Sequence, residues 1–374
     1  MTDVLAPPAA APPIQRRWIV IPLVSLVVSV ISLAFGATLV ALPGLSALWP
    51  TLEFIVLMAA VFAAVQHAEA IAHALGEPYG TLVLTMSVTV IECALILSIM
   101  LGGDGNPTLA RDTTMAVVMI ILNLIIGLSI ILGGLKYGEQ GFRVNGARSY
   151  LIVLLPLCIL TMVLPNHTSS SAGPYYSSAQ IVFISMVTLA LYVMFLYVQT
   201  VRHREFFVPE EEENDHAGEG LTPRRLLMIR FVLLSTALVG IVLLSKSFSK
   251  TIGKAVAAVG APESVIGIVV ALLVLLPESL AAIAAVRRDR MQTAINLALG
   301  SSLATIGLTI PAVGLLSIWL DMKLAFGLDG HHVVLLILSL ATAMLTFGVG
   351  RTNILPGFVH LMLMAVFVFL TFVP

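Results

Sequence analysis

The stretch SVIGIVVALLVLLPESLAAI, residues 264–283, decides the fold, because one carboxylate, Glu278, stands in a long and mostly apolar run. A second run, GTLVLTMSVTVIECALILSI at residues 80–99, likewise holds one carboxylate, Glu92. An ionisable group at membrane depth is costly, so its presence indicates an ion or proton pathway. Each acid lies fifteen residues beyond another glutamate, Glu77 or Glu263. This matched spacing predicts one site built by a repeat.

The composition predicts an integral membrane protein. The chain has 374 residues, of which 59% are hydrophobic and 10% are charged, and its mean hydropathy is +1.05. Soluble domains carry roughly 25% charged residues. The apolar stretches are about 18–25 residues long, which is the length that a helix needs to cross a bilayer. We therefore expect the lipid bilayer as a partner, and the sequence shows no pattern typical of nucleic-acid binding.

We expect an all-α protein with about eleven transmembrane helices. The expected spans are 18–36, 51–75, 80–102, 113–135, 148–165, 177–201, 226–246, 264–286, 293–318, 331–349 and 354–373. The stretch 37–49, which contains Pro43 and Gly44, either extends the first span or dips back into the membrane. Most of the 19 basic residues fall in segments that are cytoplasmic if the N-terminus is cytoplasmic. This bias favours that orientation.

The charge pattern divides the chain into two halves. Residues 202–225 form its only strongly hydrophilic segment, with four consecutive glutamates beginning at Glu210. Runs of like charge stay solvated, so we expect an acidic cytoplasmic loop, centred on 205–219. The expected parts are a cytoplasmic tail 1–17, an extra N-terminal membrane segment 18–49, a first five-helix repeat 50–201, the loop 202–225 and a second five-helix repeat 226–374.

An odd number of spans in each half inverts the second half in the membrane, as in many secondary transporters. The sequence supports this pairing through IGLSI at residues 126–130, which matches IGLTI at residues 306–310. Together with the matched spacing of the acids, this predicts two inverted five-helix repeats preceded by one extra helix.

Polar residues near the two acids are candidates for the same site. Thr85, Thr89 and Glu92 fall at i, i+4 and i+7, so they share one face of a helix. A threonine hydroxyl there either ligates the cation or bonds the protonated acid, although it can also bond its own i−4 carbonyl. Pro277 directly precedes Glu278, which predicts a broken helix beside a binding cavity or, alternatively, a kinked packing helix.

Two other spans carry polar side chains at membrane depth. The ninth span has Asn296, Gly300, Ser301, Ser302, Thr305 and Thr309. Small and hydroxylated residues also mediate ordinary helix packing, so packing and ion ligation both remain open for each of them. Asn123 is the corresponding polar residue of the fourth span, where it either donates its oxygen to the ion or bonds across helices.

A third group lies in the second span, where His67, Glu69 and His73 form either a proton relay or an interfacial ion pair. The two cysteines, Cys93 and Cys158, make neither a metal pair nor a disulfide framework. The chain lacks the motifs of nucleotide-driven pumps and metalloproteases. We therefore expect no cofactor and a secondary transporter rather than an enzyme, with energy coupling from an ion gradient.

Several of these residues together resemble a known family. Gly76-Glu77-Pro78-Tyr79-Gly80, the acid Glu92, and Arg288-Asp289-Arg290-Met291 leading into Ala298-Leu299-Gly300-Ser301-Ser302 are similar to the CAX-type cation/proton exchangers, closest to the bacterial ChaA-like calcium/proton antiporters. The resemblance implies the cation/calcium exchanger fold and the bacterial inner membrane. It also implies Glu92 and Glu278 as the metal-binding acids, with Ser301, Ser302, Asn123 and Asn296 as neutral oxygen ligands. The Gly-Asn pair that precedes each acid in the eukaryotic type is missing here.

Physical chemistry leads to the same expectation. Two carboxylates with hydroxyl and carbonyl oxygens suit Ca²⁺, which accepts about 6–8 oxygen ligands. When the cation leaves, two close carboxylates repel each other and take up protons. We therefore expect Ca²⁺/H⁺ antiport, with a Na⁺ or K⁺ for H⁺ antiporter, a cation channel and a membrane enzyme as alternatives. The sequence leaves the oligomeric state open.

Overall fold

A computed structural model describes residues 14–42, 44–76, 79–102, 107–207 and 224–373. The first half contains α1 (Arg16–Ala41), α2 (Leu45–Leu75), α3 (Tyr79–Gly102), α4 (Leu109–Met119), η1 (Ile120–Ile125), α5 (Ile126–Tyr137), β1 (Gln140–Gly141), α6 (Val144–Cys158), η2 (Ile159–Val163), η3 (Leu164–His167), α7 (Ser178–Tyr197), η4 (Val198–Arg202) and η5 (Arg204–Phe206). The second half contains α8 (Arg224–Ala258), α9 (Ser264–Val286), α10 (Met291–Ala304), η7 (Thr305–Thr309), α11 (Ile310–Trp319), α12 (Gly330–Thr346), β2 (Arg351–Thr352) and α13 (Ile354–Phe372).

The helices confirm a multi-pass membrane protein. Within the described residues, 10 helices are long and apolar enough to cross a bilayer, and the shorter apolar helix α12 supplies the remaining expected span. The fourth and ninth spans each run through a π-helical segment, so α4, η1 and α5 form one continuous rod, as do α10, η7 and α11. Much of the predicted acidic loop, residues 208–223, lies outside the described residues, as does Glu77.

Residues 37–49 are largely helical in the structure. Helix α1 continues to Ala41, and α2 begins at Leu45, so most of the stretch belongs to these two helices. Gly44 joins them with φ +83°, a left-handed conformation that glycine adopts without steric cost. The first two helices then pack against each other along their lengths.

The helices form two compact units, residues 1–88 with 208–247 and residues 89–207 with 248–374. In the first unit, α1 and α2 are joined by His67, whose Nε2 lies 2.8 Å from the carbonyl oxygen of Trp18. His67 is fully buried, so this bond gives its imidazole a partner in a place without water.

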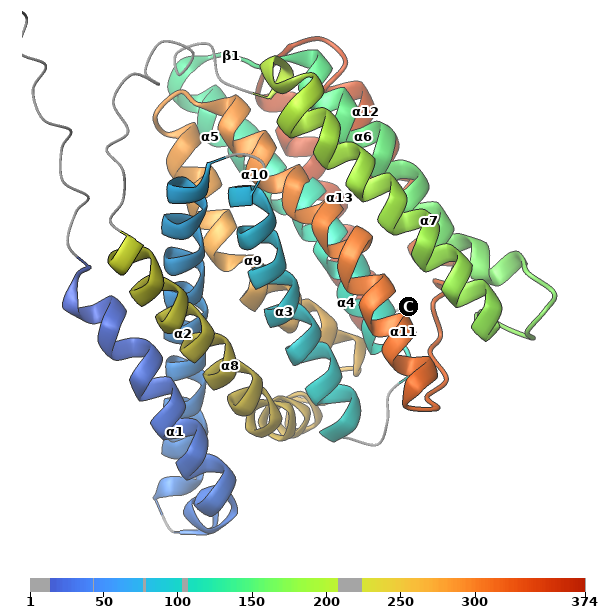
Figure 1. Ribbon diagram of the computed structural model, residues 1–374. Helices are drawn as coiled ribbons and strands as arrows, with labels where there is room; N and C mark the ends of the chain where they lie inside the picture. The colour runs from blue at the N-terminus through green and yellow to red at the C-terminus, as the bar shows by residue number, and fades with distance from the viewer. Residues whose placement is uncertain (1–13, 43, 77–78, 103–106, 208–223, 374) are drawn as a thin grey trace, which may run out of the picture. The chain divides into compact units, whose positions relative to one another are not determined.

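The second unit contains both acids that the sequence singles out. Its tightest helix pairs are α4 with α9, α9 with α10, α5 with α13 and α7 with α11. In Figure 1, α7 in green and α11 in orange lie side by side, and this pairing brings the last helix of the first half against the ninth span. The last helix of the second half, α13, packs in the same way on α5 and η1 of the fourth span.

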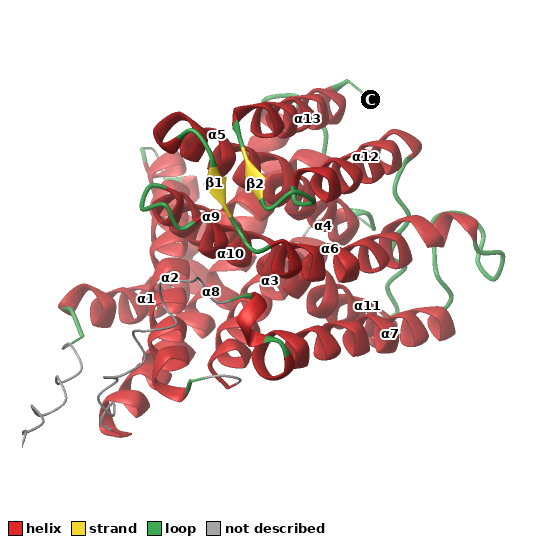
Figure 2. Ribbon diagram, turned by 90° about the horizontal axis from the view of Figure 1, so that it is seen from above, coloured by secondary structure: helices red, strands yellow, loops and turns green. Residues whose placement is uncertain are grey.

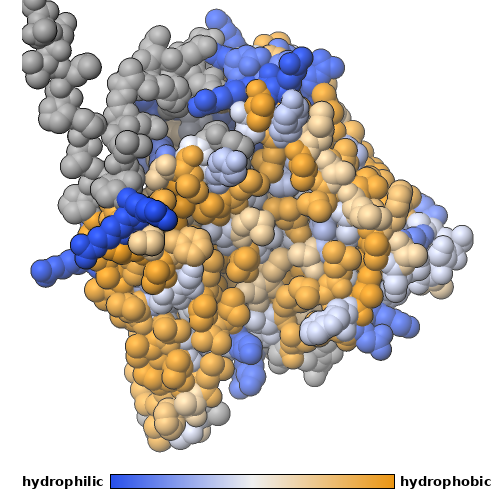
Figure 3. All heavy atoms as spheres, viewed as in Figure 1, coloured by the Kyte–Doolittle hydropathy of each residue, from blue (hydrophilic) through white to orange (hydrophobic). Residues whose placement is uncertain are grey.

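A short antiparallel pairing supports this arrangement. Strands β1 and β2, which Figure 2 shows in yellow, pair Gln140 with Thr352 and so join the end of the fourth span to the start of α13. In the face shown in Figure 3, hydrophobic side chains cover much of the visible surface. Exposed apolar residues such as Phe183, Val193 and Met194 on α7 agree with a surface that faces lipid.

Candidate functional site

Glu92, an acid in an apolar span, accepts two hydrogen bonds from hydroxyl groups of another helix. This residue lies on α3 and is 2% exposed. The Thr305 hydroxyl donates a hydrogen bond of 2.8 Å to Oε1, and the Thr309 hydroxyl donates one of 2.6 Å to Oε2. Two carboxylate oxygens are thus held by two hydroxyls from one segment of the other half of the chain.

The hydroxyls of Thr305 and Thr309, on the π-helix η7, differ from many other threonine hydroxyls in the protein. In α-helical turns here, threonine hydroxyls bond their own helix, as Thr114 does with the carbonyl of Ala110 and Thr188 with that of Ile184. Thr305 and Thr309 are four residues apart on η7, and both donate across to another helix. π-Helical turns are rare and often mark functional sites.

Glu278 lies on α9 and is partly buried, with its Oε2 enclosed by protein atoms. The neighbouring Pro277 does not break the helix, since α9 runs from Ser264 to Val286. The expectation of a broken helix at this point was wrong, because a single lost backbone bond in a well-packed helix is tolerated. Ser279 donates to the carbonyl of Leu275, so its hydroxyl is used within α9.

The predicted hydroxyl ligands Ser301 and Ser302 lie on α10, just before η7. Both Oγ atoms are buried and have no hydrogen-bond partner among the residues that the structure describes. A buried hydroxyl without a partner is costly, so such atoms suggest a ligand site. Helix α10 packs against α9, which carries Glu278. It continues into η7, whose threonines donate hydrogen bonds to Glu92. The oxygen-rich donor set of this region fits a hard cation.

The two predicted amide ligands have other partners. Asn123 is fully buried on η1, where its Nδ2 donates to Ser339 Oγ at 2.8 Å and its Oδ1 lies 3.1 Å from His360 Nδ1. Asn296 donates to the carbonyl of Phe207 at 2.5 Å and accepts from Gln292 at 2.8 Å. Asn123 therefore makes bonds across helices, the second of the two possibilities raised by the sequence, and Asn296 bonds Phe207, the residue directly after η5.

The remaining candidates are spread along two helices. Thr89 is buried one turn before Glu92 on α3. On α2, His67 bonds the backbone of Trp18, Glu69 accepts from Gln66 at 2.9 Å, and His73 is exposed at the end of the helix. A proton relay through these three residues stays a prediction. In the described part of the chain, no group of three or more His, Cys, Asp or Glu side chains is placed to hold a metal ion.

Comparison with known proteins gives the family. The model of the sodium/calcium exchanger protein family matches residues 45–201 and 229–373, which include both acids and all or most of each α-helix from α2 onward. The chain belongs to the sodium/calcium exchanger family. The two matched stretches are separated by the acidic segment, so the family match follows the two halves expected from the sequence.

Relatives of this exchanger are found in several bacteria. A Sinorhizobium fredii protein named as an ionic transporter is 42% identical over 358 residues, 96% of each chain. The sodium-potassium/proton antiporter ChaA of Escherichia coli is 35% identical over 324 residues, 86% of this chain and 88% of its own. The solved structure of the Ca²⁺/H⁺ antiporter protein YfkE superposes with a TM-score of 0.70 at 20% identity, over 96% of this chain and 100% of that one. This superposition establishes the exchanger fold.

Sequence reasoning missed two buried ionisable residues of this exchanger. Glu53 on α2 is 3% exposed, and its carboxylate accepts from Trp49 Nε1 and from the Ser247 hydroxyl, each at 2.8 Å. His360 on α13 is fully buried. The same signal that identified Glu92, an ionisable residue in an apolar span, would have found both.

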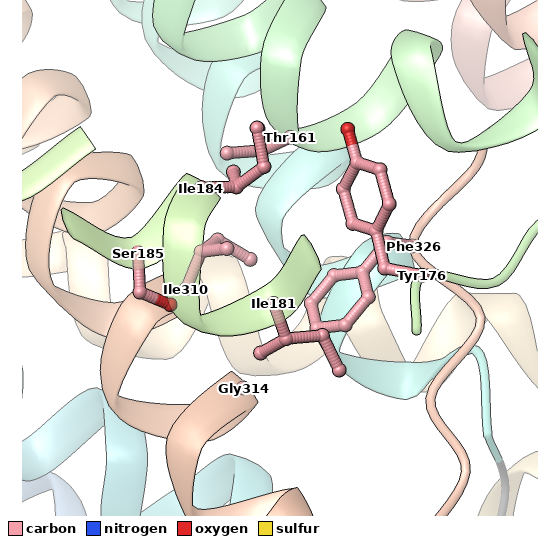
Figure 4. A pocket seen from close by; sticks show the side chains of 8 residues that line it. All are labelled: Thr161, Tyr176, Ile181, Ile184, Ser185, Ile310, Gly314 and Phe326. Carbon is pink, nitrogen blue, oxygen red and sulfur yellow. The ribbon is translucent and has the colours of Figure 1, made fainter. Parts of the chain in front are cut away.

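The exchanger also has a small, mostly apolar cavity. It lies between α7, α11 and the segments near Tyr176 and Phe326, and Figure 4 shows its lining. The Thr161 and Tyr176 hydroxyls that border it already bond backbone carbonyls at 2.7 and 2.6 Å. This cavity offers no oxygen set for a cation.

Proposed function

We propose that this exchanger is a cation/proton antiporter that moves cytoplasmic Ca²⁺ outward as protons enter, with Glu92 and Glu278 binding cation and protons in alternation. The contact between Glu92 and the hydroxyls of Thr305 and Thr309 is the observation that carries the proposal. Among the described residues, no basic side chain forms an ion pair with Glu92, although the residue is buried in an apolar span. A carboxylate in that setting requires either a cation or a proton.

The chemistry of exchange follows from this requirement. Hydroxyl and carboxylate oxygens together form a hard-oxygen set, which Ca²⁺ accepts in flexible geometry. When the cation leaves, protonation neutralises the acid, and the threonine hydroxyls can still bond it because a hydroxyl both donates and accepts. Cation and protons thus compete for the same oxygens, and this competition produces antiport. Thr89, Ser301 and Ser302 are proposed as neutral oxygens of the same site.

The direction of transport rests on the orientation of the chain. We place the N-terminus in the cytoplasm and the protein in the bacterial inner membrane. Arg16 and Arg17 open α1, and Arg287, Arg288 and Arg290 follow α9 at an end that would then be cytoplasmic. With this orientation, the inward proton gradient drives the extrusion of Ca²⁺.

A second candidate is the exchange of Na⁺ or K⁺ for protons. The Escherichia coli relative named as a sodium-potassium/proton antiporter, which is 35% identical to this chain over 324 residues, favours it. The amide ligands of the eukaryotic type are missing beside both acids, which leaves fewer oxygens for a divalent ion. Both candidates use the same two acids.

Purified protein in proteoliposomes with an imposed pH difference tests the proposal. We expect the pH step to drive Ca²⁺ against its gradient, with Na⁺ and K⁺ measured in parallel vesicles. A flux of Na⁺ or K⁺ without Ca²⁺ would establish the second candidate, and a purely passive cation flux would indicate a channel. Glu92→Gln and Glu278→Gln should each abolish the coupled flux while the protein still elutes as a single species. Wild-type flux in either variant would overturn the assignment of the site.

A further inference from the structure

A buried polar network surrounds His360, a residue to which the exchange chemistry above assigns no role. His360 Nδ1 lies 3.1 Å from Asn123 Oδ1, and His360 Nε2 lies 3.1 Å from Thr346 Oγ1. Asn123 Nδ2 donates to Ser339 Oγ at 2.8 Å. All four side chains are between 0% and 6% exposed, so the network is closed to water. It joins η1 of the first half to α12 and α13 of the second.

The donors and acceptors around His360 determine which nitrogen of its imidazole ring carries the hydrogen. An amide oxygen only accepts, so His360 Nδ1 must carry the hydrogen that it donates to Asn123. In the neutral ring Nε2 then accepts, and the Thr346 hydroxyl supplies the hydrogen. Each of these polar atoms is satisfied by a neutral imidazole with its hydrogen on Nδ1.

The network lies against the helices that carry the acids. The π-helix η1, which holds Asn123, packs on α9 and α10 as well as on α13. Helix α9 carries Glu278, and α10 carries Ser301 and Ser302. A shift of η1 would therefore displace the helices that form the proposed cation site.

The matched motifs of the two halves each pack against the last helix of the other half. A Cβ added to Gly307 would lie 2.8 Å from Tyr192 Cβ on α7, and one added to Gly127 would lie 3.2 Å from His360 Cβ on α13. The two glycines are equivalent in IGLTI and IGLSI, so the last helix of each half presents a large ring to the other half. The ring of His360 on α13 also bonds a side chain of the facing π-helix, Asn123.

We propose that His360 is a positioning residue for cation exchange, which acts by donating from Nδ1 to Asn123 and thereby fixing the amide and the π-helix η1 against α9 and α10. This inference rests on the proposed function, because it concerns the same cation site. An amide oxygen has two lone pairs, so Asn123 Oδ1 keeps one for a further partner while His360 prevents the amide from flipping. The role requires a hydrogen-bond donor at the place of Nδ1 and does not require a titrating group.

The surroundings of His360 are consistent with a positioning role. The elements packed on α13 are α5, η1 and α12, and the side chains that bond the ring are Asn123 on η1 and Thr346 on α12. The titratable side chains of α5 and α12 make other contacts, and the ring centroid of His331 lies 4.1 Å from that of His332. His332 on α12 stacks near Phe367 at 5.8 Å, and Lys136 and Tyr137 at the end of α5 bond the carbonyl of Arg287.

Two substitutions of His360 distinguish a role in positioning Asn123 from a role in carrying protons. His360→Asn places an amide nitrogen near the position of Nδ1 and removes the titratable ring, whereas His360→Leu removes the donor and keeps an apolar side chain. In proteoliposomes we expect His360→Leu to raise the KM for the transported cation about tenfold, the effect of one lost hydrogen bond. We expect His360→Asn to keep the KM within about twofold and to leave the pH profile of exchange unchanged.

The outcomes that overturn the proposal are distinct. Wild-type KM in His360→Leu would show that the contact has no role in exchange. A changed pH profile in His360→Asn would make His360 a proton carrier and not a positioning residue. The melting temperature in detergent, measured for both variants, separates a folding defect from the KM effect, and Asn123→Ala combined with His360→Leu should be no worse than either alone.

A spectroscopic measurement makes the test independent of transport. Protein with ¹⁵N-labelled histidine, compared with His360→Asn to assign the signal, should show a neutral Nδ1–H tautomer for His360 at neutral pH. The opposite tautomer, or a charged ring, would overturn the proposal even if exchange is observed. If the wild-type protein exchanges no cation, the proposed function is wrong, but the ¹⁵N signal of His360 can still be measured and interpreted.

Discussion

Thr309 on η7 donates a hydrogen bond of 2.6 Å to Oε2 of Glu92 on α3, although 217 residues separate them in the chain. The other carboxylate oxygen is held by Thr305, one turn earlier on the same π-helix. Glu92, in the first half of the chain, is therefore held by two hydroxyls of the second half, and this contact cannot form from either half alone.

Replacing Thr309 by valine tests this contact, because valine keeps the shape and removes the hydroxyl. A hydrogen bond to a charged group contributes about 1.5–3 kcal/mol, so we expect the apparent cation affinity to fall about tenfold or more. Thr309→Ser retains the hydroxyl and should stay near the wild type. Initial rates of exchange over a range of cation concentrations measure the effect, and an unchanged KM in Thr309→Val would show that the hydroxyl does not support the cation-binding acid.

Glu53 provides a contrast with Glu92. Its carboxylate is held within one unit by Trp49 and Ser247, both neutral donors. We expect Glu53→Gln to retain coupled exchange, because an amide can still accept from both donors. The same flux assay that is abolished by Glu92→Gln measures it. A complete loss of flux in Glu53→Gln with a normal melting temperature would instead place a third acid in the transport cycle.

The close packing of α9 on α4 predicts the effect of a substitution at Gly267. A Cβ there would lie 2.8 Å from backbone atoms of Asp112 and Thr113, which cannot move aside as a flexible side chain would. We expect Gly267→Ala to lower the free energy of unfolding by about 1–3 kcal/mol. Gly253→Ala on α8 is the matched control, since nothing lies within 4 Å of its added Cβ. Thermal unfolding in detergent compares the two, and equal melting temperatures would contradict the packing.

Tyr176, between the fifth and sixth spans, predicts a dependence of stability on alkaline pH. Burial raises the pKa of Tyr176 from 10.0 to about 12, and its hydroxyl donates to the carbonyl of Leu160 at 2.6 Å. The folded chain thus holds this proton more tightly than the unfolded chain does. The stability that Tyr176 contributes is complete below about pH 10 and is lost as the pH rises to about 12.

Tyr176→Phe is the comparison for that dependence. It removes the hydrogen bond and should cost about 1 kcal/mol of unfolding free energy at neutral pH. Because phenylalanine does not titrate, the difference between the two proteins should shrink as the pH rises from 10 to 12. Melting temperatures over this range measure it, and a constant difference would mean that Tyr176 does not titrate in the folded state as expected.

The membrane architecture could be predicted from the sequence because long apolar runs are a local property of the chain. The cost of a charge in lipid, which is likewise local, singled out Glu92 and Glu278, whose role in cation binding stays a prediction. Glu92 and Glu278 required no knowledge of their neighbours. The motif pair at Gly127 and Gly307 similarly indicated the repeat before any helix was placed.

The partners of these residues could not be predicted in the same way. The bond from Thr309 to Glu92 depends on how spans far apart in the sequence pack, and hydrophobic periodicity does not report packing partners. The π-helices η1 and η7 depend on one extra residue per turn, which apolar composition does not reveal. Asn123 bonds His360 and Ser339, and these partners could not be predicted either, because they depend on how α12 and α13 pack against η1.

The packing of α13 on η1 has a consequence for how the protein is made. Helix α13 is synthesised after the helices that precede it, so Asn123 enters the membrane before His360 exists to bond it. Until then the amide oxygen of Asn123 needs another partner, in the insertion machinery, in water or in temporary neighbours. Translation that stops before α13 would leave this oxygen without the hydrogen that His360 Nδ1 donates to it.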